Sequence, residues 1–303
     1  GTKLYPMEQS ILKESTEDSI QESKNRIERF ISNSSSSFIL VGTFLLMLGA
    51  VSLFFILAPY FERIHLERMS STWGIVLMII GFSLLTIKLS FITYILFLYL
   101  KYKVVKPVSD SELPLCTVIV PAYNEGELVY KTLKSLVASD YPEEKLQIIS
   151  IDDGSQDNTW EWMKKAQNEL GNRVSIYQQP ENRGKRHALY RGFKLGTGDV
   201  FITVDSDSIV LKDTLRTMAS PFVVNQDCGA VAGNVRVLNS KKALIPRMLN
   251  VSFAFSFEFI RSAQSSLGSV LCTPGALSAY RREAVFNCLH DWINQTFMGE
   301  VSK

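Results

Sequence analysis

The stretch Phe201-Ile202-Thr203-Val204-Asp205-Ser206-Asp207-Ser208 predicts both the fold of the chain and the place of its site. Four β-prone residues run directly into two aspartates, Asp205 and Asp207. Because successive side chains of a strand alternate between faces, the two carboxylates are expected to point the same way at the strand exit. Their oxygens suit Mg²⁺ or Mn²⁺ carrying a diphosphate. The alternative is a solvated loop with two acidic residues.

The composition limits the classes of function. A chain of 303 residues has room for about two domains, and its net charge of +2 gives no basic field that would favour nucleic acid as a partner. The cysteines lack the Cys-x-x-Cys or Cys/His spacing of zinc sites, and their scatter predicts free thiols in a reducing compartment. They are Cys116, Cys228, Cys272 and Cys288.

The first hundred residues predict a tail followed by a transmembrane hairpin. Residues 1–37 are polar and are expected to be a flexible cytosolic tail, with a membrane-surface segment around 17–31 as the alternative. The apolar runs 38–60 and 73–100 are each long enough to cross a bilayer. Buried core helices are the alternative. Only Lys88 interrupts the second run, and there it should face protein, water or a partner helix, or reach a headgroup.

Lysine and arginine residues flank the hairpin at both ends. The positive-inside rule therefore favours both ends in the cytosol, although by a thin margin. The sequence thus predicts a multi-pass protein of the cell membrane whose remaining domain is cytosolic, joined to the hairpin by a linker over 101–114.

From residue 115 onward the pattern is that of an α/β domain. Apolar β-rich runs alternate with helical stretches, which predicts a mostly parallel sheet covered on both faces. In such sheets ligands bind at the carboxyl ends of the strands. The expected strands are 115–120, 146–151, 174–177, 200–204 and 229–237, and the expected helices are 126–138, 157–170, 185–195 and 211–225.

The first strand ends in Val120-Pro121-Ala122-Tyr123-Asn124-Glu125. Pro121 stops the ladder, and Asn124 is placed to cap the next helix. A capping role for Asn124 does not explain why Tyr123 and Glu125 stand on either side of it. The ring of Tyr123 suits a nucleobase, and the carboxylate of Glu125 suits a hydrogen bond from a base or a ribose.

Two more exits carry charged groups. The second strand ends in Asp152-Asp153-Gly154-Ser155, where one aspartate could accept from uracil N3–H while the other faces ribose or metal; ordinary turn chemistry is the alternative. Asn182-Arg183-Gly184-Lys185-Arg186-His187 opens a helix, whose N-terminus with Lys185 and Arg186 predicts an anion site; a solvated basic turn is the alternative. Together the four exits predict a site for a nucleotide diphosphate and a metal.

The four motifs also resemble a known family. Val-Pro-Ala-Tyr-Asn-Glu, Asp-Asp-Gly-Ser, Asn-Arg-Gly-Lys-Arg and Asp-Ser-Asp are similar to those of membrane-bound inverting family 2 glycosyltransferases, which have a GT-A fold. The segments 257–265, 272–282 and 294–299 resemble hyaluronan synthases, whose relatives include nodulation-type chitin-oligosaccharide synthases and chitin synthases. The resemblance covers roughly residues 38–300.

The resemblance implies a role for each matching position. It implies a GT-A (Rossmann-like) glycosyltransferase domain over 115–303, Asp207 as ligand of Mn²⁺ or Mg²⁺, and Cys272 and Gly275 at the acceptor end. It also implies an interfacial helix at about 244–265, whose apolar face agrees independently, with a core-packed helix as the alternative. The residues implied to bind UDP are Tyr123, Glu125, Asp152, Asp153, Lys185 and Asp205.

The implied activity is processive, metal-dependent elongation of a β-linked polysaccharide at a membrane. UDP-GlcNAc and UDP-glucuronate are the expected donors, and the growing polysaccharide and membrane lipids the other partners. Alternatives are a chitin-type synthase using UDP-GlcNAc alone, a β-glucan synthase using UDP-glucose, and a non-catalytic UDP-sugar-binding protein. A Rossmann dehydrogenase is disfavoured because no G-x-G-x-x-G follows the first strand.

An inverting transfer also needs a general base. In the family the base is an aspartate in a Gly-Asp-Asp or Gly-Glu-Asp motif just after the Phe-x-Gly that matches 297–299. That motif is expected beyond Lys303, and Glu283, Asp291 and Glu300 are poor substitutes. The catalytic residue is therefore unknown, and the 303 residues are expected to be a truncated synthase that binds donor but is inactive alone.

Overall fold

A computed structural model describes residues 45, 47–60, 63–67, 69, 71–237, 244–297 and 300–301. The chain divides into two compact units, Gly1–Phe91 and Ile92–Lys303, and each is described by itself. The predicted tail at 1–37, the start of the first apolar run and Gly299 lie outside the described residues.

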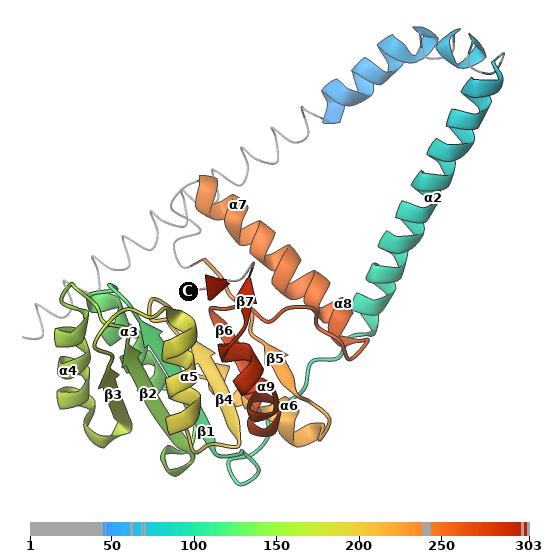
Figure 1. The fold of residues 1–303 in the computed structure, drawn as a ribbon. Coiled ribbons are helices and arrows are strands. Elements are labelled where there is room, and N and C mark those ends of the chain that lie inside the picture. The colour runs from blue at the N-terminus through green and yellow to red at the C-terminus, as the bar shows by residue number, and fades with distance from the viewer. Residues whose placement is uncertain are drawn as a thin grey trace, which may run out of the picture. The chain divides into compact units, whose positions relative to one another are not determined.

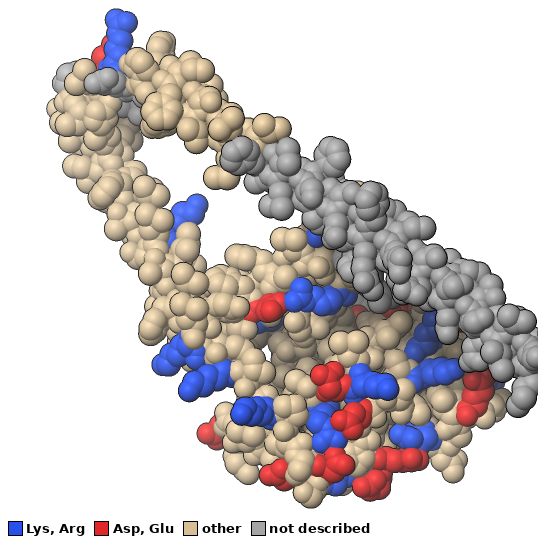
Figure 2. Space-filling model, turned by 180° about the vertical axis from the view of Figure 1, so that it is seen from behind, with Lys and Arg blue, Asp and Glu red and all other residues tan. Residues whose placement is uncertain are grey.

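Helix α2 (Thr72–Lys101) begins in the first unit, and its last residues belong to the second. Within it only Lys88 and Lys101 are charged, and its surface is almost entirely tan in Figure 2. At 30 residues it is about 45 Å long, more than the roughly 30 Å of a bilayer core. Among the described helices it alone is long and apolar enough to cross a membrane, whereas the apolar helix at Met47–Tyr60 is shorter. The second predicted span is thus a long apolar helix, and the hairpin stays a prediction.

The second unit is built on a six-stranded sheet with the order β3-β2-β1-β4-β6-β5 (Figure 1). Strands β1 to β4 pair in parallel, whereas β6 runs antiparallel to both of its neighbours. Parallel pairing brings the carboxyl ends of the first four strands to one edge. The strands are β1 (Cys116–Ala122), β2 (Leu146–Asp152), β3 (Val174–Gln178), β4 (Val200–Val204), β5 (Ala230–Ala232) and β6 (Leu277–Arg281).

Helices cover both faces of the sheet, as an all-buried β1 requires. Val118 and Val120 pack in the core formed with α3 (Glu127–Val137), α4 (Thr159–Leu170) and α6 (Thr214–Val224). Ile119 packs in the opposite layer, with α5 (Lys185–Leu195) and α9 (Arg282–Ile293). A Cβ on Gly192 would lie 2.4 Å from Ile119, so this glycine lets α5 approach the sheet closely.

The elements predicted between residues 115 and 224 agree with the structure to within three residues at each end. After that point two predictions are wrong. The run 229–237 was expected to be one strand, but only Ala230–Ala232 pair with the sheet. Strand β6 was not predicted because Leu-Ser-Ala-Tyr-Arg has no β-branched residue, and its antiparallel insertion makes the sheet mixed.

Residues 244–265, where an interfacial helix is predicted, are helical; their place at a membrane stays a prediction. The segment consists of α7 (Leu244–Phe253), the π-helical η3 (Ala254–Ile260) and α8 (Arg261–Ser265). Its exposed apolar side chains include Ile245, Met248, Val251 and Phe255. The end of α2 packs on this segment within the second unit, because Ser266 Oγ donates to Leu98 O at 2.9 Å and the rings of Tyr99 and Phe259 lie 4.9 Å apart.

Candidate active site

The exits of β1, β2 and β4 and the start of α5 come together at one edge of the sheet. Ala122 of β1 pairs with Asp152 of β2, and the next amide, Asp153 N, donates to Ala122 O at 2.9 Å. This edge carries the side chains that the sequence pattern predicts to bind a nucleotide diphosphate.

Asn124 holds the exit of β1 against the exit of β2. Its φ of 54° is unusual for a residue with a side chain. The side-chain Oδ1 accepts from Gln156 N at 2.9 Å, and the backbone N–H donates to Ser155 Oγ at 3.0 Å. The prediction that Asn124 caps α3 is wrong, because Gly126 is the N-cap and no side chain caps that helix.

Thr159 fixes the neighbouring backbone. Its buried Oγ1 accepts the N–H groups of Glu125 and Gly126 at 2.8 and 2.9 Å and donates to Asp157 Oδ1 at 2.5 Å. The loop backbone is therefore held while Tyr123 stays 39% exposed. Sequence reasoning missed Thr159, although the Ser, Asp, Asn and Thr residues of 155–159 before a helix are a recognisable signal.

Asp152 is fully buried at the end of β2. Its Oδ1 accepts Ser155 N at 3.1 Å and its Oδ2 accepts Gln178 Nε2 at 2.9 Å. The first bond is the turn chemistry considered as an alternative for this motif. The carboxylate is thus rigidly oriented by the chain's own donors.

Asp153 is also buried, with 2% exposure. Oδ1 accepts from Gln179 Nε2 at 2.6 Å and Arg183 N at 3.1 Å, and Oδ2 accepts from Gly184 N at 2.8 Å. Two backbone donors expected to serve an anion before α5 are therefore occupied by this carboxylate. Of the groups predicted to bind an anion here, the ammonium of Lys185 at the start of α5 is not bonded to Asp153.

Lys185, the first residue of α5, joins three parts of the site. Its ammonium pairs with Asp205 after β4 and donates to Gly275 O at 3.2 Å in the segment before β6. Asp205 N in turn donates to Ala276 O at 3.1 Å. The structure thus brings together Lys185, Asp205 and Gly275, which lie far apart in the sequence.

Arg186 takes a different direction from Lys185. Its Nη1 donates to Gln295 O at 3.0 Å, and its guanidinium lies 5.8 Å from the centre of the Trp292 ring. The sequence pattern suggested that Lys185 and Arg186 form one shared anion site. In the structure the two side chains instead contact different groups. Lys185 alone is paired with Asp205.

Asp205 and Asp207 lie in a turn, because β4 ends at Val204. Strand alternation therefore does not set their directions. Ser208 N donates to Asp205 O at 3.1 Å to close the turn, and Thr132 Oγ1 of α3 donates to Ser206 O at 2.7 Å. Cys272 is exposed, with its Sγ 3.3 Å from Thr273 O, so of the two expected acceptor residues only Gly275 contacts the Lys185 cluster.

Several carboxylates lie near Glu125 at this edge. Partial burial, and then the charges of Asp207, Asp205 and Asp157, raise the pKa of Glu125 above its ordinary value. The exits of β1 and β4 therefore share one negative field. No group of three metal-binding side chains occurs among the described residues. The donor set of carboxylate oxygens nevertheless fits a hard dication that takes its other ligands from phosphate and water.

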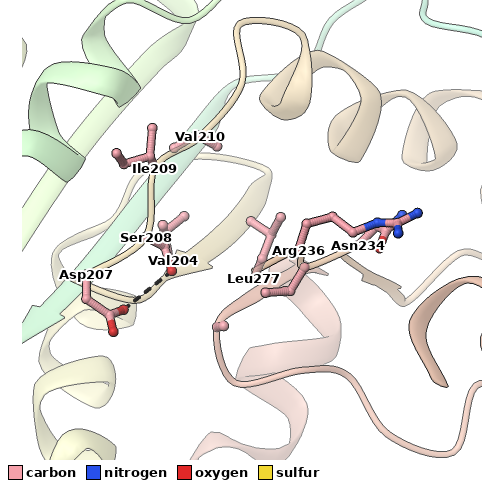
Figure 3. Close-up of a pocket in the computed structure, with 10 residues that line it drawn as sticks. Val204, Asp207, Ser208, Ile209, Val210, Asn234, Arg236 and Leu277 are labelled. Atoms are coloured by element: carbon pink, nitrogen blue, oxygen red, sulfur yellow. Dashed lines mark hydrogen bonds between the residues drawn. The ribbon is translucent and has the colours of Figure 1, made fainter. Parts of the chain in front are cut away.

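A cavity of about 280 Å³ opens beside Asp207. Val204, Val210 and Leu277 give it apolar walls, and Asp207 and Asn234 add polar groups (Figure 3). Arg236 extends away from Asp207 in this view, and its guanidinium pairs with Glu258 of η3. Ser208 Oγ donates to Asp207 Oδ1 at 3.5 Å, a long contact that leaves the carboxylate largely available.

Comparisons with known proteins identify the family that the chain resembles. The model of the family "Glycosyl transferase family 2" matches residues 117–287. A hyaluronan synthase of Streptococcus pyogenes is 33% identical over 186 residues, which is 60% of this chain and 44% of the relative. An N-acetylglucosaminyltransferase of Rhizobium meliloti is 32% identical over 198 residues, which is 65% of this chain and 46% of the relative. The chain thus spans less than half the length of these curated relatives.

A solved structure supports the fold alone. Mannosyltransferase PcManGT from Pyrobaculum calidifontis, in complex with GDP-Man and Mn²⁺, has a TM-score of 0.52 and 24% identity, and the match covers 67% of this chain and 56% of that one. The predicted GT-A fold and the resemblance noted from the four motifs are confirmed.

Proposed function

The chain belongs to glycosyl transferase family 2, and from that premise we propose that it holds the donor site of an inverting UDP-sugar transferase. The observation that carries the proposal is the cluster at the sheet edge, where Lys185 contacts Asp205 and Gly275 while Asp207 and Glu125 share one negative field. The cluster offers a cation for a diphosphate and carboxylates for a dication.

We assign the nucleoside to the exits of β1 and β2. The half-exposed ring of Tyr123 stacks on uracil, and the carboxylates of Glu125 and Asp152 accept from the ribose and the base. Asp152 is suited to this because Ser155 N and Gln178 Nε2 fix its orientation, and each oxygen keeps a second lone pair. Asp153, the next residue, has its oxygens bonded to Gln179, Arg183 and Gly184 and is not assigned a contact with the nucleoside.

The diphosphate lies against Lys185, whose ammonium compensates the charge that develops on the departing UDP. Asp205 orients Lys185, and Asp207 is the protein ligand of a Mn²⁺ or Mg²⁺ ion. Such an ion, when bound, supplies Lewis-acid stabilisation of the leaving group. The sugar occupies the cavity beside Asp207, whose mixture of apolar walls and polar groups suits a pyranose ring, with Gly275 and Cys272 toward the acceptor.

For the product, we propose hyaluronan, made by alternating transfer from UDP-GlcNAc and UDP-glucuronate onto a growing polysaccharide. The likeness to the Streptococcus pyogenes hyaluronan synthase supports this choice. A second candidate is transfer from UDP-GlcNAc alone, which the likeness to the Rhizobium meliloti N-acetylglucosaminyltransferase supports.

We further propose that the protein is multi-pass in the cell membrane, with the donor site in the cytosol. The length and apolar surface of α2 support a span, and the exposed apolar side chains of α7 and η3 support contact with lipid. The domain boundaries expected at residues 37, 100 and 114 belong to this proposal.

Calorimetry of the 303-residue chain with UDP and with GDP, each with and without Mn²⁺, tests the donor site. We expect UDP to bind more tightly than GDP and to do so with help from the metal. Equal affinity for both nucleotides, or no effect of Mn²⁺, contradicts the proposal. In the complete protein, polymer formed only when both UDP-GlcNAc and UDP-glucuronate are present supports hyaluronan, whereas polymer from UDP-GlcNAc alone supports the second candidate.

A further inference from the structure

Asp153 is a buried carboxylate whose two oxygens are both engaged. It is 2% exposed and accepts three hydrogen bonds, from Gln179 Nε2, Arg183 N and Gly184 N. A buried carboxylate is tolerated when such donors replace its water. Two of these donors belong to the turn that precedes α5, so the charge of Asp153 is committed to holding that turn.

Gly154 brings the exit of β2 into direct backbone contact with the same turn. Its φ is 71°, and a Cβ there would lie 2.6 Å from the carbonyl carbon of Glu181 and 2.7 Å from Asn182 N. Only a glycine fits both the conformation and the space. Asp153 and Gly154 together therefore clamp residues 181–184 from one side.

The turn leads directly into Lys185. Gly184, with φ 90°, is the N-cap of α5 and has no side chain of its own with which to cap the helix. The Gly184 N–H donates both to Asp153 Oδ2 at 2.8 Å and to Asn182 Oδ1 at 2.9 Å, and the negative charge of Asp153 lies at the positive end of the helix dipole. The next residue reaches Asp205 and Gly275 with its ammonium. An unbroken set of contacts thus connects Asp153 to the Lys185 cluster.

We propose that Asp153 is a positioning residue that holds the turn 181–184 and so directs Lys185 toward Asp205 and Gly275, without touching the nucleotide itself. This deepens the proposed function, on which it rests in one respect: Lys185 is taken to bind the diphosphate. It replaces the expectation that Asp153 contacts the base, the ribose or the metal.

The test compares UDP with uridine as ligands of the 303-residue chain, because only UDP carries the diphosphate that Lys185 would bind. We expect Asp153→Asn to weaken UDP binding about tenfold, since a neutral amide cannot accept all three N–H groups, and to leave uridine binding within about twofold. Lys185→Met should give the same pattern. In the double variant the Asp153→Asn change should cost no further UDP affinity, because coupled residues are not additive.

Asp152→Asn is the matched control, because it changes an equally buried aspartate at the same strand end. It should weaken uridine and UDP alike. Equal loss of uridine and UDP in Asp153→Asn, or an undiminished loss when Lys185 is already Met, overturns the inference. Gln179→Met serves if Asp153→Asn fails to fold: it removes one donor to Asp153 and should give a smaller loss of UDP affinity with uridine unaffected.

A measurement without nucleotide separates this inference from the proposed function. The acylation rate of Lys185 by an amine-reactive ester, followed by peptide mass mapping, should rise in Asp153→Asn but not in Asp152→Asn. If the wild-type chain binds no UDP, the proposed function fails while this rate still tests the positioning. An unchanged rate in Asp153→Asn overturns the positioning itself.

Discussion

Two pairs of aspartates lie at the same edge of one sheet but differ in burial and in the number of hydrogen bonds that their carboxylates accept. Asp152 and Asp153 are buried at the end of β2, and every carboxylate oxygen of the pair accepts an N–H from the chain. Asp205 and Asp207 lie in the partly exposed turn after β4, where one pairs with Lys185 and the other has a single long contact with Ser208.

The difference shows that aspartates at the ends of neighbouring strands can have their oxygens engaged by the chain's own N–H groups or left largely available to a ligand. A buried carboxylate whose two oxygens accept N–H groups of the chain is held in place and contributes to stability. Removing a carboxylate that has few partners costs the fold little, and the oxygens of such a carboxylate are available to a cation. Substitutions in each pair of aspartates test this contrast, because the two pairs are expected to affect different measured quantities.

The largest expected effect is on metal-dependent UDP binding, and it comes from the partly exposed pair Asp205 and Asp207. Asp207→Asn should lower the Mn²⁺-dependent part of UDP affinity by about a hundredfold, because an amide replaces a charged ligand of a dication. Calorimetry with and without Mn²⁺ measures this. Asp227→Asn, at an exposed position in the turn before β5, is the control and should change nothing. Full retention of the metal effect in Asp207→Asn removes Asp207 as the ligand.

The second effect is on the stability of the fold, and it comes from the buried pair Asp152 and Asp153. Asp152→Ala should lower the free energy of unfolding by about 2–4 kcal/mol, because Ser155 N and Gln178 Nε2 lose their acceptor in a buried place. Denaturant unfolding followed by tryptophan fluorescence gives the value. Asp207→Ala should stay within about 0.5 kcal/mol of wild type. The contrast between the pairs fails if the two alanine variants lose equal stability.

A third, smaller effect sharpens the contrast at the exit of β1. Thr159→Val should cost about 1–2 kcal/mol of stability and weaken uridine binding, because the N–H groups of Glu125 and Gly126 lose their shared acceptor. Thr159→Ser keeps the hydroxyl and is the matched control. A valine variant that binds uridine like wild type would show that this backbone support is not needed for the nucleoside.

The smallest effect is the pH dependence that Glu125 contributes. The pKa of Glu125 is raised in the folded state, so the folded state binds more protons than the unfolded one as the pH rises above the unfolded value of about 4.3. Ionisation therefore destabilises the fold as the pH rises through that window. Without metal, the stability of Glu125→Gln relative to wild type should be greater at pH 7 than at pH 3. An equal difference at both pH values contradicts a raised pKa of Glu125, which burial and then the neighbouring carboxylates cause.

The sequence predicts the elements through residue 224 because each carries a strong local pattern, such as Phe201–Val204 followed by two acids. It does not predict β6, because Leu277–Arg281 has weak strand propensity and joins the sheet only through pairing with β4 and β5. The identity of the acids at the strand ends could be read from the sequence. The sequence could not show whether the oxygens of Asp153 or Asp207 are available to a ligand. That depends on donors such as Gly184 N and Gln179 Nε2, which other parts of the chain bring to Asp153.

The π-helical η3 has a consequence for any engineering of residues 244–265. Each residue of a π-helix advances by less than the roughly 100° of an α-helix, so the side-chain phase of α8 is offset from that of α7. A single helical wheel drawn through the whole segment assigns Arg261 to the wrong face. Deleting one residue within Ala254–Ile260 is therefore expected to rotate α8 about the helix axis relative to α7, although no residue of α8 itself is changed.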